Sequence, residues 1–323
     1  PRFKGDEYSD KPALEHNASV ARKAAEEGIV LLRNNAGALP LAPDSKIALF
    51  GVTSYDFITG GTGAGNVNGS YVIDLRQGLS DAGFALDKTT DEFYADCMRY
   101  ERFNTKRINS KFDQWFVDAE RPAEALPSKD ILTRAAKEAD KAIITIGRVF
   151  GEGKDRLHQF SYLLSAAEMR LIKAVSEAFH AEGKRLIVVL DVGGIVDMTA
   201  WQDMADAIVV SWLPGCEAGH AVASVLSGRE TPSGRLSMSV PVSYYDDPTA
   251  CSMPQILTDK PVNYSFYRPA PAGIKKRYDL ENIDYVNYRE GIYSGYRYYV
   301  TEKVRTAYPF GFGLSYTDFR YSG

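Results

Sequence analysis

Cysteine and histidine are scarce in this sequence, with three and four occurrences among 323 residues. The cysteines, Cys97, Cys216 and Cys251, are odd in number and far apart, which fits neither a zinc-binding spacing nor a disulfide framework. His158 and His220 have no partners spaced as metal ligands, so both are interpreted as surface or packing residues. No metal site is therefore expected.

Long apolar runs and an excess of positive charge are also absent. No run approaches the roughly 20 apolar residues that span a bilayer, and residues 1–16 contain no signal-peptide core. The formal net charge is −4, without a Lys/Arg cluster among aromatic residues, which argues against nucleic acid or a membrane surface as a partner. The cellular compartment stays open. Residues 1–15 are expected to be a linker from a preceding segment.

Short apolar stretches alternate with helical patterns between residues 16 and 242. The expected strands are 46–50, 84–87, 141–147, 185–190, 207–212 and 235–240. The expected helices are 16–32, 74–82, 128–139, 165–180, 197–204 and 217–226, with further helix within 91–120. Such alternation predicts an α/β fold: a mostly parallel sheet of about six strands with helices on both faces, an α/β sandwich over residues 16–242.

Two of these helices carry recognisable start signals. Ser128 is a plausible N-cap, and Ser165 with Glu168 has the spacing of a capping box. From residue 243 onward the periodicity is lost in a sequence rich in Pro, Tyr and Asn, which is too long for a routine connection. Residues 243–323 are expected to be an extended, Tyr-rich segment that packs on the sandwich. It either covers a partner or the rim of a site, or it is a purely structural covering.

Open parallel sheets bind ligands beyond the carboxyl ends of their strands, which directs attention to the loops over 51–65 and 147–156. The first contains TGGTGAGNVNGS, and Asp87 follows at the distance of a ribose-binding acid. The G-x-G-x-x-G spacing fails, because Asn66 stands where the last glycine should be. A loop whose backbone approaches another ligand is favoured over nucleotide binding, and a plain flexible loop is the third alternative.

The second loop presents one carboxylate, Glu152, between Gly151 and Gly153. A single glutamate on a loop is either a solvated acid or a general acid, and glycoside chemistry needs a second carboxylate. Glu217 begins a helix, where an acid in the first turn interacts favourably with the helix dipole. No G-x-S-x-G elbow or local Ser/His/Asp signature occurs.

Several stretches together resemble glycoside hydrolase family 3, the β-glucosidases and β-xylosidases, in their second, α/β-sandwich domain. They occur in the family's order and cover nearly the whole chain: ARKAAEEGIVLLRN with LPL, GGTGAGNVN, GEGKDR, WLPGCEAGHAVASVLSG, PSGRLSMSVP, YREGIYSGYRYY and YPFGFGLSYTDF. The family usually continues after the last motif into a fibronectin-like domain. The resemblance implies no metal or organic cofactor.

The resemblance further implies a retaining β-glycosidase. Its nucleophile would be an aspartate on a separate (β/α)8 barrel, outside this chain, and Glu152 would inherit the general acid/base role. Such a pair lies about 5 to 5.5 Å apart, and burial beneath the barrel would raise the acid's pKa. Asp155 and Arg156 are read as supports of the loop.

Thr62, Gly63 and Ala64 fall in the loop that binds the sugar in the family. Ala64 replaces a serine that is usual there, and a lost hydroxyl costs roughly 1 to 3 kcal/mol when its partner stays unpaired. The expected substrate is a terminal β-linked glucose, with xylose and N-acetylglucosamine also open. Two alternatives are kept: a catalytically silent carbohydrate-binding or scaffold module, and a nucleotide-binding doubly wound protein.

Overall fold

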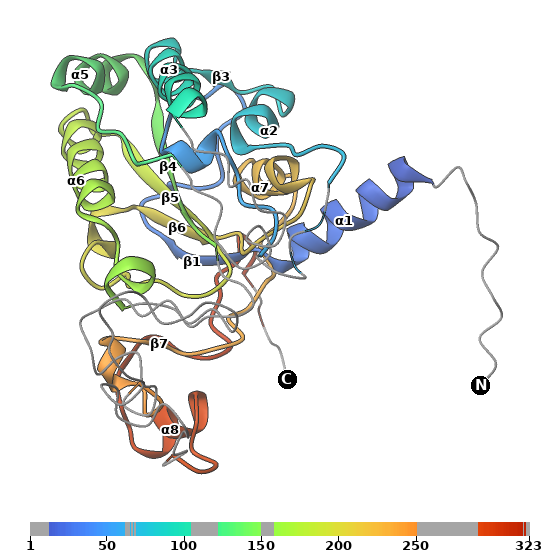
Figure 1. Ribbon diagram of the computed structural model, residues 1–323, viewed down its shortest axis with the longest axis vertical. Coiled ribbons are helices and arrows are strands. Elements are labelled where there is room, and N and C mark those ends of the chain that lie inside the picture. Colours follow the sequence, from blue (N-terminus) through green and yellow to red (C-terminus); the bar gives the residue numbers. More distant parts are fainter. Residues whose placement is uncertain are drawn as a thin grey trace, which may run out of the picture.

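The computed structural model describes residues 13–61, 65, 67, 69–104, 122–149, 158–250, 290–318 and 320 (Figure 1). Its strands are β1 (Val30–Asn34), β2 (Lys46–Phe50), β3 (Ala85–Leu86), β4 (Lys141–Arg148), β5 (Arg185–Val192), β6 (Ala207–Val210), β7 (Val240–Pro241) and β8 (Thr306–Tyr308). Its α-helices are α1 (Leu14–Gly28), α2 (Leu75–Asp81), α3 (Lys88–Asn104), α5 (Lys129–Glu138), α6 (Ala166–Ala181), α7 (Ala218–Leu226) and α8 (Tyr296–Thr301). Short turns of helix are η1 (Val52–Ser54), η3 (His158–Tyr162), η4 (Gln202–Met204) and η5 (Tyr244–Asp246).

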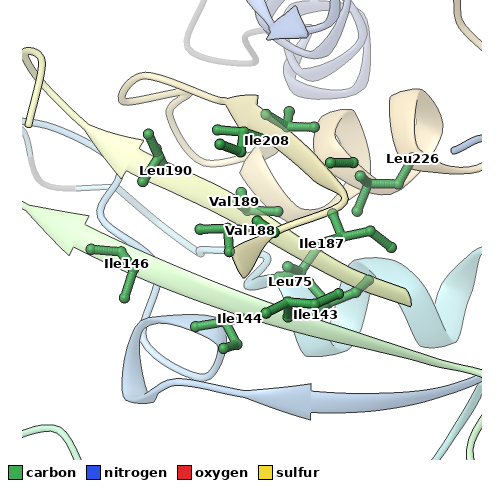
Figure 2. Packing of buried hydrophobic residues seen from close by; sticks show 14 of the residues in the cluster. Leu75, Ile143, Ile144, Ile146, Ile187, Val188, Val189, Leu190, Ile208 and Leu226 are labelled. Atoms are coloured by element: carbon green, nitrogen blue, oxygen red, sulfur yellow. The ribbon is translucent and has the colours of Figure 1, made fainter. Parts of the chain in front are cut away.

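The main sheet has six strands in the order β1-β6-β5-β4-β2-β3. All neighbours are parallel except β1 and β6, which pair antiparallel. Consecutive residues such as Ile143 and Ile144 are both fully buried, as expected for strands covered on both faces. Figure 2 shows these isoleucines among the aliphatic side chains of β5 and β6, with Leu75 of α2 and Leu226 of α7 packed nearby.

Helices cover the sheet in two groups, as Figure 1 shows: α3, α5 and α6 on one side, and α1, α2 and α7 on the other. The capping box at α6 is confirmed, because the Ser165 hydroxyl accepts from the Glu168 amide and the Glu168 carboxylate accepts from the Ser165 amide. Ser128 caps α5 in the same way, accepting from the amide of Ile131. The predicted α/β sandwich is confirmed.

The sixth strand is not the predicted one. The helix expected over residues 16–32 ends at Gly28, and the apolar residues that follow form β1 at the sheet edge. The strand expected over 235–240 is wrong: of these residues only Val240 belongs to a strand, β7, which pairs with β8 in a separate two-stranded sheet. Helical spacing of apolar residues runs on across the α1–β1 boundary, so periodicity alone could not locate it.

The α-helix expected over residues 197–204 is also wrong, since the segment contains only turns and η4. The Asp197 carboxylate accepts hydrogen bonds from both the amide and the hydroxyl of Thr199, at 3.2 and 2.7 Å. These local bonds favour a turn over a helix. Trp201 then lies 1% exposed, with its indole nitrogen donating to the carbonyl of Asp197.

The far C-terminal residues return to the sandwich. The amide of Leu314 donates to the Leu31 carbonyl at 2.7 Å, which makes an antiparallel bridge to β1. The Tyr316 hydroxyl donates to the carbonyl of Val225 in α7. Of the Tyr-rich segment predicted over 243–323, residues 251–289 lie outside the described residues. Within the part of the chain that is described, no helix is long and apolar enough to cross a bilayer.

Candidate functional site

The carboxyl ends of β2, β4, β5 and β6 lie at one edge of the sheet, because these strands are parallel neighbours. The two loops singled out from the sequence, after β2 and after β4, therefore begin side by side, as predicted. A Cβ on Gly147, near the end of β4, would lie 2.7 Å from the Thr53 side chain and 2.8 Å from Ile58 Cδ1. The bases of the two loops are in direct contact.

The structure does not place the predicted catalytic and sugar-binding residues or the predicted supports of the second loop. Thr62, Gly63, Ala64, Glu152, Asp155 and Arg156 all lie outside the described residues, so their assigned roles stay predictions. The described residues on either side of them define where each loop leaves the sandwich and where it returns.

The start of the Gly-rich loop is held by β5 and by the segment that follows β6. The amide of Ile58 donates to Asp191 Oδ2 at 2.6 Å, and Asp191 is a fully buried residue in the last part of β5. One residue later, the Thr59 carbonyl accepts from the amide of Gly215 at 3.2 Å, beyond the end of β6. Hydrogen bonds to a buried carboxylate are strong, so the loop leaves the sheet from a fixed point.

The return of the same loop is held by the segment before α7. The amide of Ile73 donates to the Cys216 carbonyl at 2.9 Å, and the Gly219 amide donates to the Ile73 carbonyl at 2.8 Å. The Tyr71 hydroxyl donates to Glu217 Oε1 at 2.6 Å. Both ends of the Gly-rich loop are therefore attached to the stretch WLPGCEAGH, residues 212–220.

The described residues on either side of the second loop are joined by the guanidinium of Arg148, the last residue of β4. It forms an ion pair with Glu168 at 2.6 Å and also donates to the carbonyls of Ser161 and Leu163, at 3.2 and 3.3 Å. Burial disfavours the charged form of Glu168, but the Arg148 contacts outweigh burial and hold the pKa of Glu168 below its usual value. Arg148 thus joins the residues before the loop to those after it.

His158, the first described residue after that loop, packs among tyrosines. Its ring centroid lies 6.0 Å from Tyr162, 4.8 Å from Tyr244 and 5.4 Å from Tyr245. This environment agrees with the interpretation of His158 as a packing residue. Within the described residues, no group of three or more His, Cys, Asp or Glu side chains is arranged to hold a metal ion.

Sequence reasoning missed Glu124, which lies beside η1. Its carboxylate accepts from the amides of Val52 at 3.3 Å and Ala125 at 3.0 Å, and from the Tyr94 hydroxyl at 3.3 Å. Burial raises the pKa of Glu124 to about 7 despite these bonds. The segment before α5 has no periodicity or motif, so nothing in the sequence singled out this residue.

The structure argues against nucleotide binding, because Asp87, the candidate ribose-binding acid, is buried and already has partners. Asp87 is fully buried, and its carboxylate accepts from the Thr90 amide at 3.1 Å at the start of α3. Lys46 Nζ lies 3.2 Å from the other carboxylate oxygen. A carboxylate engaged in this way cannot bind a ribose hydroxyl.

A Ser, a His and an Asp do meet at the opposite edge of the sheet. His180 Nε2 lies 2.7 Å from Asp206 Oδ2, and its Nδ1 lies 3.1 Å from the Ser176 hydroxyl. The hydroxyl donates to the Met204 carbonyl at 2.8 Å, and Ser176 is only 6% exposed. The Ser176 hydroxyl therefore donates its proton to a carbonyl and not to His180, as a nucleophile would. The three side chains instead link α6 to the residues that precede β6.

Comparison with known proteins agrees with this fold and with the motif order. Residues 29–316 match the glycosyl hydrolase family 3 C-terminal domain. β-Glucosidase A of Butyrivibrio fibrisolvens is 32% identical over 338 residues, covering 95% of this chain and 36% of that protein. An exo-α-(1→6)-L-arabinopyranosidase of Bifidobacterium longum is 28% identical over 317 residues, covering 94% of this chain and 34% of that protein.

Among solved structures, β-glucosidase 3B from Thermotoga neapolitana in complex with glucose has a TM-score of 0.83 and 39% identity, over 98% of this chain and 40% of that one. The chain spans about a third of the length of the curated relatives it matches. The resemblance drawn from the motifs is confirmed, and this chain belongs to glycosyl hydrolase family 3, matching its C-terminal domain.

Proposed function

We propose that this chain is the acid/base-bearing half of a retaining, exo-acting β-glucosidase, with Glu152 as the general acid/base. The observation that carries the proposal is that the loop with Glu152 and the Gly-rich loop leave the sheet at the same edge. They follow the adjacent strands β4 and β2, and Gly147 at the start of one loop lies against Thr53 at the start of the other. Membership of the family supports it independently.

The chemistry needs two carboxyl groups. Glu152 would first protonate the glycosidic oxygen as the aglycone leaves, while an aspartate on a (β/α)8 barrel attacks the anomeric carbon and forms a covalent glycosyl-enzyme. Glu152 would then act as a base and take a proton from the water that releases the sugar. The barrel is the partner that completes the site.

The anchors described above suit this task. An acid that must reach a glycosidic oxygen within hydrogen-bond distance benefits from a loop whose ends are held in place. Arg148 holds the ends of the loop after β4 through its contacts with Glu168 and with the carbonyls of Ser161 and Leu163. Asp155 and Arg156 are proposed to brace the same loop from within.

The proposed substrate is a glucoside with a terminal β-linked glucose, and the loop residues Thr62, Gly63 and Ala64 are proposed to lie against that sugar. The relative of known structure bound to glucose supports this choice. A relative named for L-arabinopyranoside hydrolysis illustrates that sugar preference differs among relatives, so a panel of aryl glycosides belongs in the test.

The test uses the chain together with its barrel. Glu152→Gln should reduce hydrolysis of cellobiose by at least about a hundredfold, with a smaller loss on an aryl glucoside whose leaving group needs little protonation. Added azide should restore turnover of the aryl glucoside and yield the β-glucosyl azide. The matched control is Glu182→Gln, an exposed glutamate after α6, which should leave all rates unchanged.

An assembly with unchanged cellobiose hydrolysis after Glu152→Gln would contradict the acid/base assignment. An assembly that binds glucose in calorimetry but hydrolyses none of the glycosides would favour the alternative from the sequence, a catalytically silent carbohydrate-binding module.

A further inference from the structure

The stretch WLPGCEAGH is a motif that the acid/base chemistry does not use. Both ends of the Gly-rich loop are attached to it, through Gly215 to Thr59 and through Cys216 to Ile73. One further link is made by side chains alone: the hydrogen bond of 2.6 Å from Tyr71 to Glu217. This link lies on the returning side of the loop.

Glu217 is at the centre of a polar network that joins three helices. Its second oxygen lies 2.7 Å from His220 Nδ1 and 3.6 Å from Arg22 Nε of α1. His220 reaches on with its Nε2 to Asp81 of α2 at 2.9 Å. Glu217 is only 8% exposed, so this network fixes its carboxylate at one position.

The dipole interpretation of Glu217 does not account for this arrangement. Glu217 is the N-cap residue of α7, yet its side chain makes no capping hydrogen bond. Its oxygens face Tyr71 and His220 instead. Burial disfavours the charged form, but those two hydrogen bonds outweigh it and lower the pKa of Glu217, while the bond to Glu217 raises the pKa of the Tyr71 hydroxyl.

Tyr71 contributes little to the core, because 40% of the residue is exposed. Its hydroxyl nevertheless donates to a charged acceptor, a stronger kind of hydrogen bond than one between neutral groups. A side chain with weak packing and one strong directed bond is suited to fix the course of the backbone that carries it.

We infer that Tyr71 and Glu217 are positioning residues for sugar binding, holding the returning end of the Gly-rich loop against α7. The inference rests on the proposed function, in which that loop contacts the terminal sugar. A loop that binds the sugar equally in ground state and transition state changes KM and leaves kcat alone.

The test compares Tyr71→Phe, Glu217→Gln and their double variant in the chain with its barrel. Tyr71→Phe should raise KM for an aryl β-glucoside about fivefold to tenfold, with kcat within about twofold of the parent. Because the two residues act through one contact, the double variant should raise KM far less than the product of the single effects. Tyr100→Phe is the matched control, since Tyr100 is 68% exposed and belongs to α3, on the other side of the sheet from the network.

Amide hydrogen exchange gives a second measurement that does not depend on turnover. Peptides covering residues 65–73 should exchange faster in Tyr71→Phe and in Glu217→Gln than in the parent, while peptides from β4 and β5 should be unchanged. Equal loop exchange and equal KM in parent and variants would overturn the inference.

Failure of the proposed function has a different signature. A parent assembly without hydrolysis, or with hydrolysis insensitive to Glu152→Gln, removes the sugar-binding role and with it the inference, even where the loop exchanges faster. A parent that depends on Glu152, combined with variants at Tyr71 that lower only the unfolding midpoint, overturns the positioning role alone.

Discussion

The guanidinium of Arg148 and the carboxylate of Glu168 form a bidentate ion pair, with Nη1–Oε1 and Nη2–Oε2 distances of 2.6 and 2.7 Å. Their side chains are 13% and 10% exposed. The same carboxylate completes the capping box of α6, accepting from the Ser165 amide. One buried pair therefore joins the end of β4 to the start of α6.

Removing one member of this pair should be costly. Arg148→Ala leaves Glu168 charged and buried, and we expect a loss of about 3 to 5 kcal/mol in the free energy of unfolding, measured by urea titration. The control is Lys173→Ala, which breaks an exposed pair with Glu177 whose side chains are 65% and 68% exposed and should cost under about 0.5 kcal/mol. Equal losses in the two variants would contradict the role assigned to Arg148.

The lowered pKa of Glu168 also predicts that the free energy of unfolding decreases at acid pH. Its pKa is lower in the folded state than the ordinary value of 4.5, so its contribution is present above pH 4.5 and is lost as pH falls through the folded-state pKa. In Glu168→Gln the free energy of unfolding should depend less on pH below pH 4.5. If this pH dependence is the same in the variant and the parent, it comes from other carboxylates.

The raised pKa of Glu124 should have the opposite effect on the pH dependence of stability. Its pKa rises from 4.5 to about 7 in the folded state, so between these values the folded protein holds a proton that the unfolded chain has released. The free energy of unfolding should therefore decrease as pH rises from 4.5 to 7, by at most about 3 kcal/mol from this group. In Glu124→Gln the decrease should shrink, as measured by urea titration at several pH values.

Gly147 is expected to tolerate no side chain. In Gly147→Ala the new Cβ would collide with Thr53 and Ile58 at the base of the Gly-rich loop. We expect a loss of about 1 to 3 kcal/mol in stability and a fall in kcat/KM of the complete assembly. Gly28→Ala is the control, because no atom beyond its chain neighbours and the backbone of its own helix lies within 4 Å of the added Cβ. The stability of this variant should match or exceed that of the parent.

Ala64→Ser tests the departure from the family's usual serine. The added hydroxyl should find a partner on the bound sugar and raise kcat/KM on aryl β-glucosides by about fivefold or more. The rise should be smaller on a glycoside that lacks the partner hydroxyl. A rate unchanged on every glycoside of the panel would show that residue 64 does not contact the sugar.

Local signals in the sequence predicted much of the fold. The capping box at Ser165 and the apolar runs of β2, β4, β5 and β6 depend on residues close together in the chain, and each lies where it was expected. The edge strand β1 was missed because its pairing partners lie at residues 207–210 and 314. Apolar spacing near Ile29 carries no trace of those distant partners.

The same distinction holds for the site. Gly-rich spacing and a carboxylate between glycines marked the two loops, since both are local patterns. The links that hold the loops are not local: Arg148 pairs with a residue 20 positions on, and Tyr71 with one 146 positions on. No sequence pattern connects such pairs, so the contacts of Glu124 and of Glu217 are visible only in the folded structure.

The bridge between Leu31 and Leu314 bears on how this domain folds. β1 lies early in the chain, but it cannot be paired on both sides until β6 and the residues near 314 have been synthesised. Contacts of such wide separation slow folding, and until they form, β1 presents an unpaired apolar edge that invites association with other chains. The backbone at Leu314 therefore covers the edge of β1 that β6 leaves open, and in the folded domain it shields Leu31 from such association.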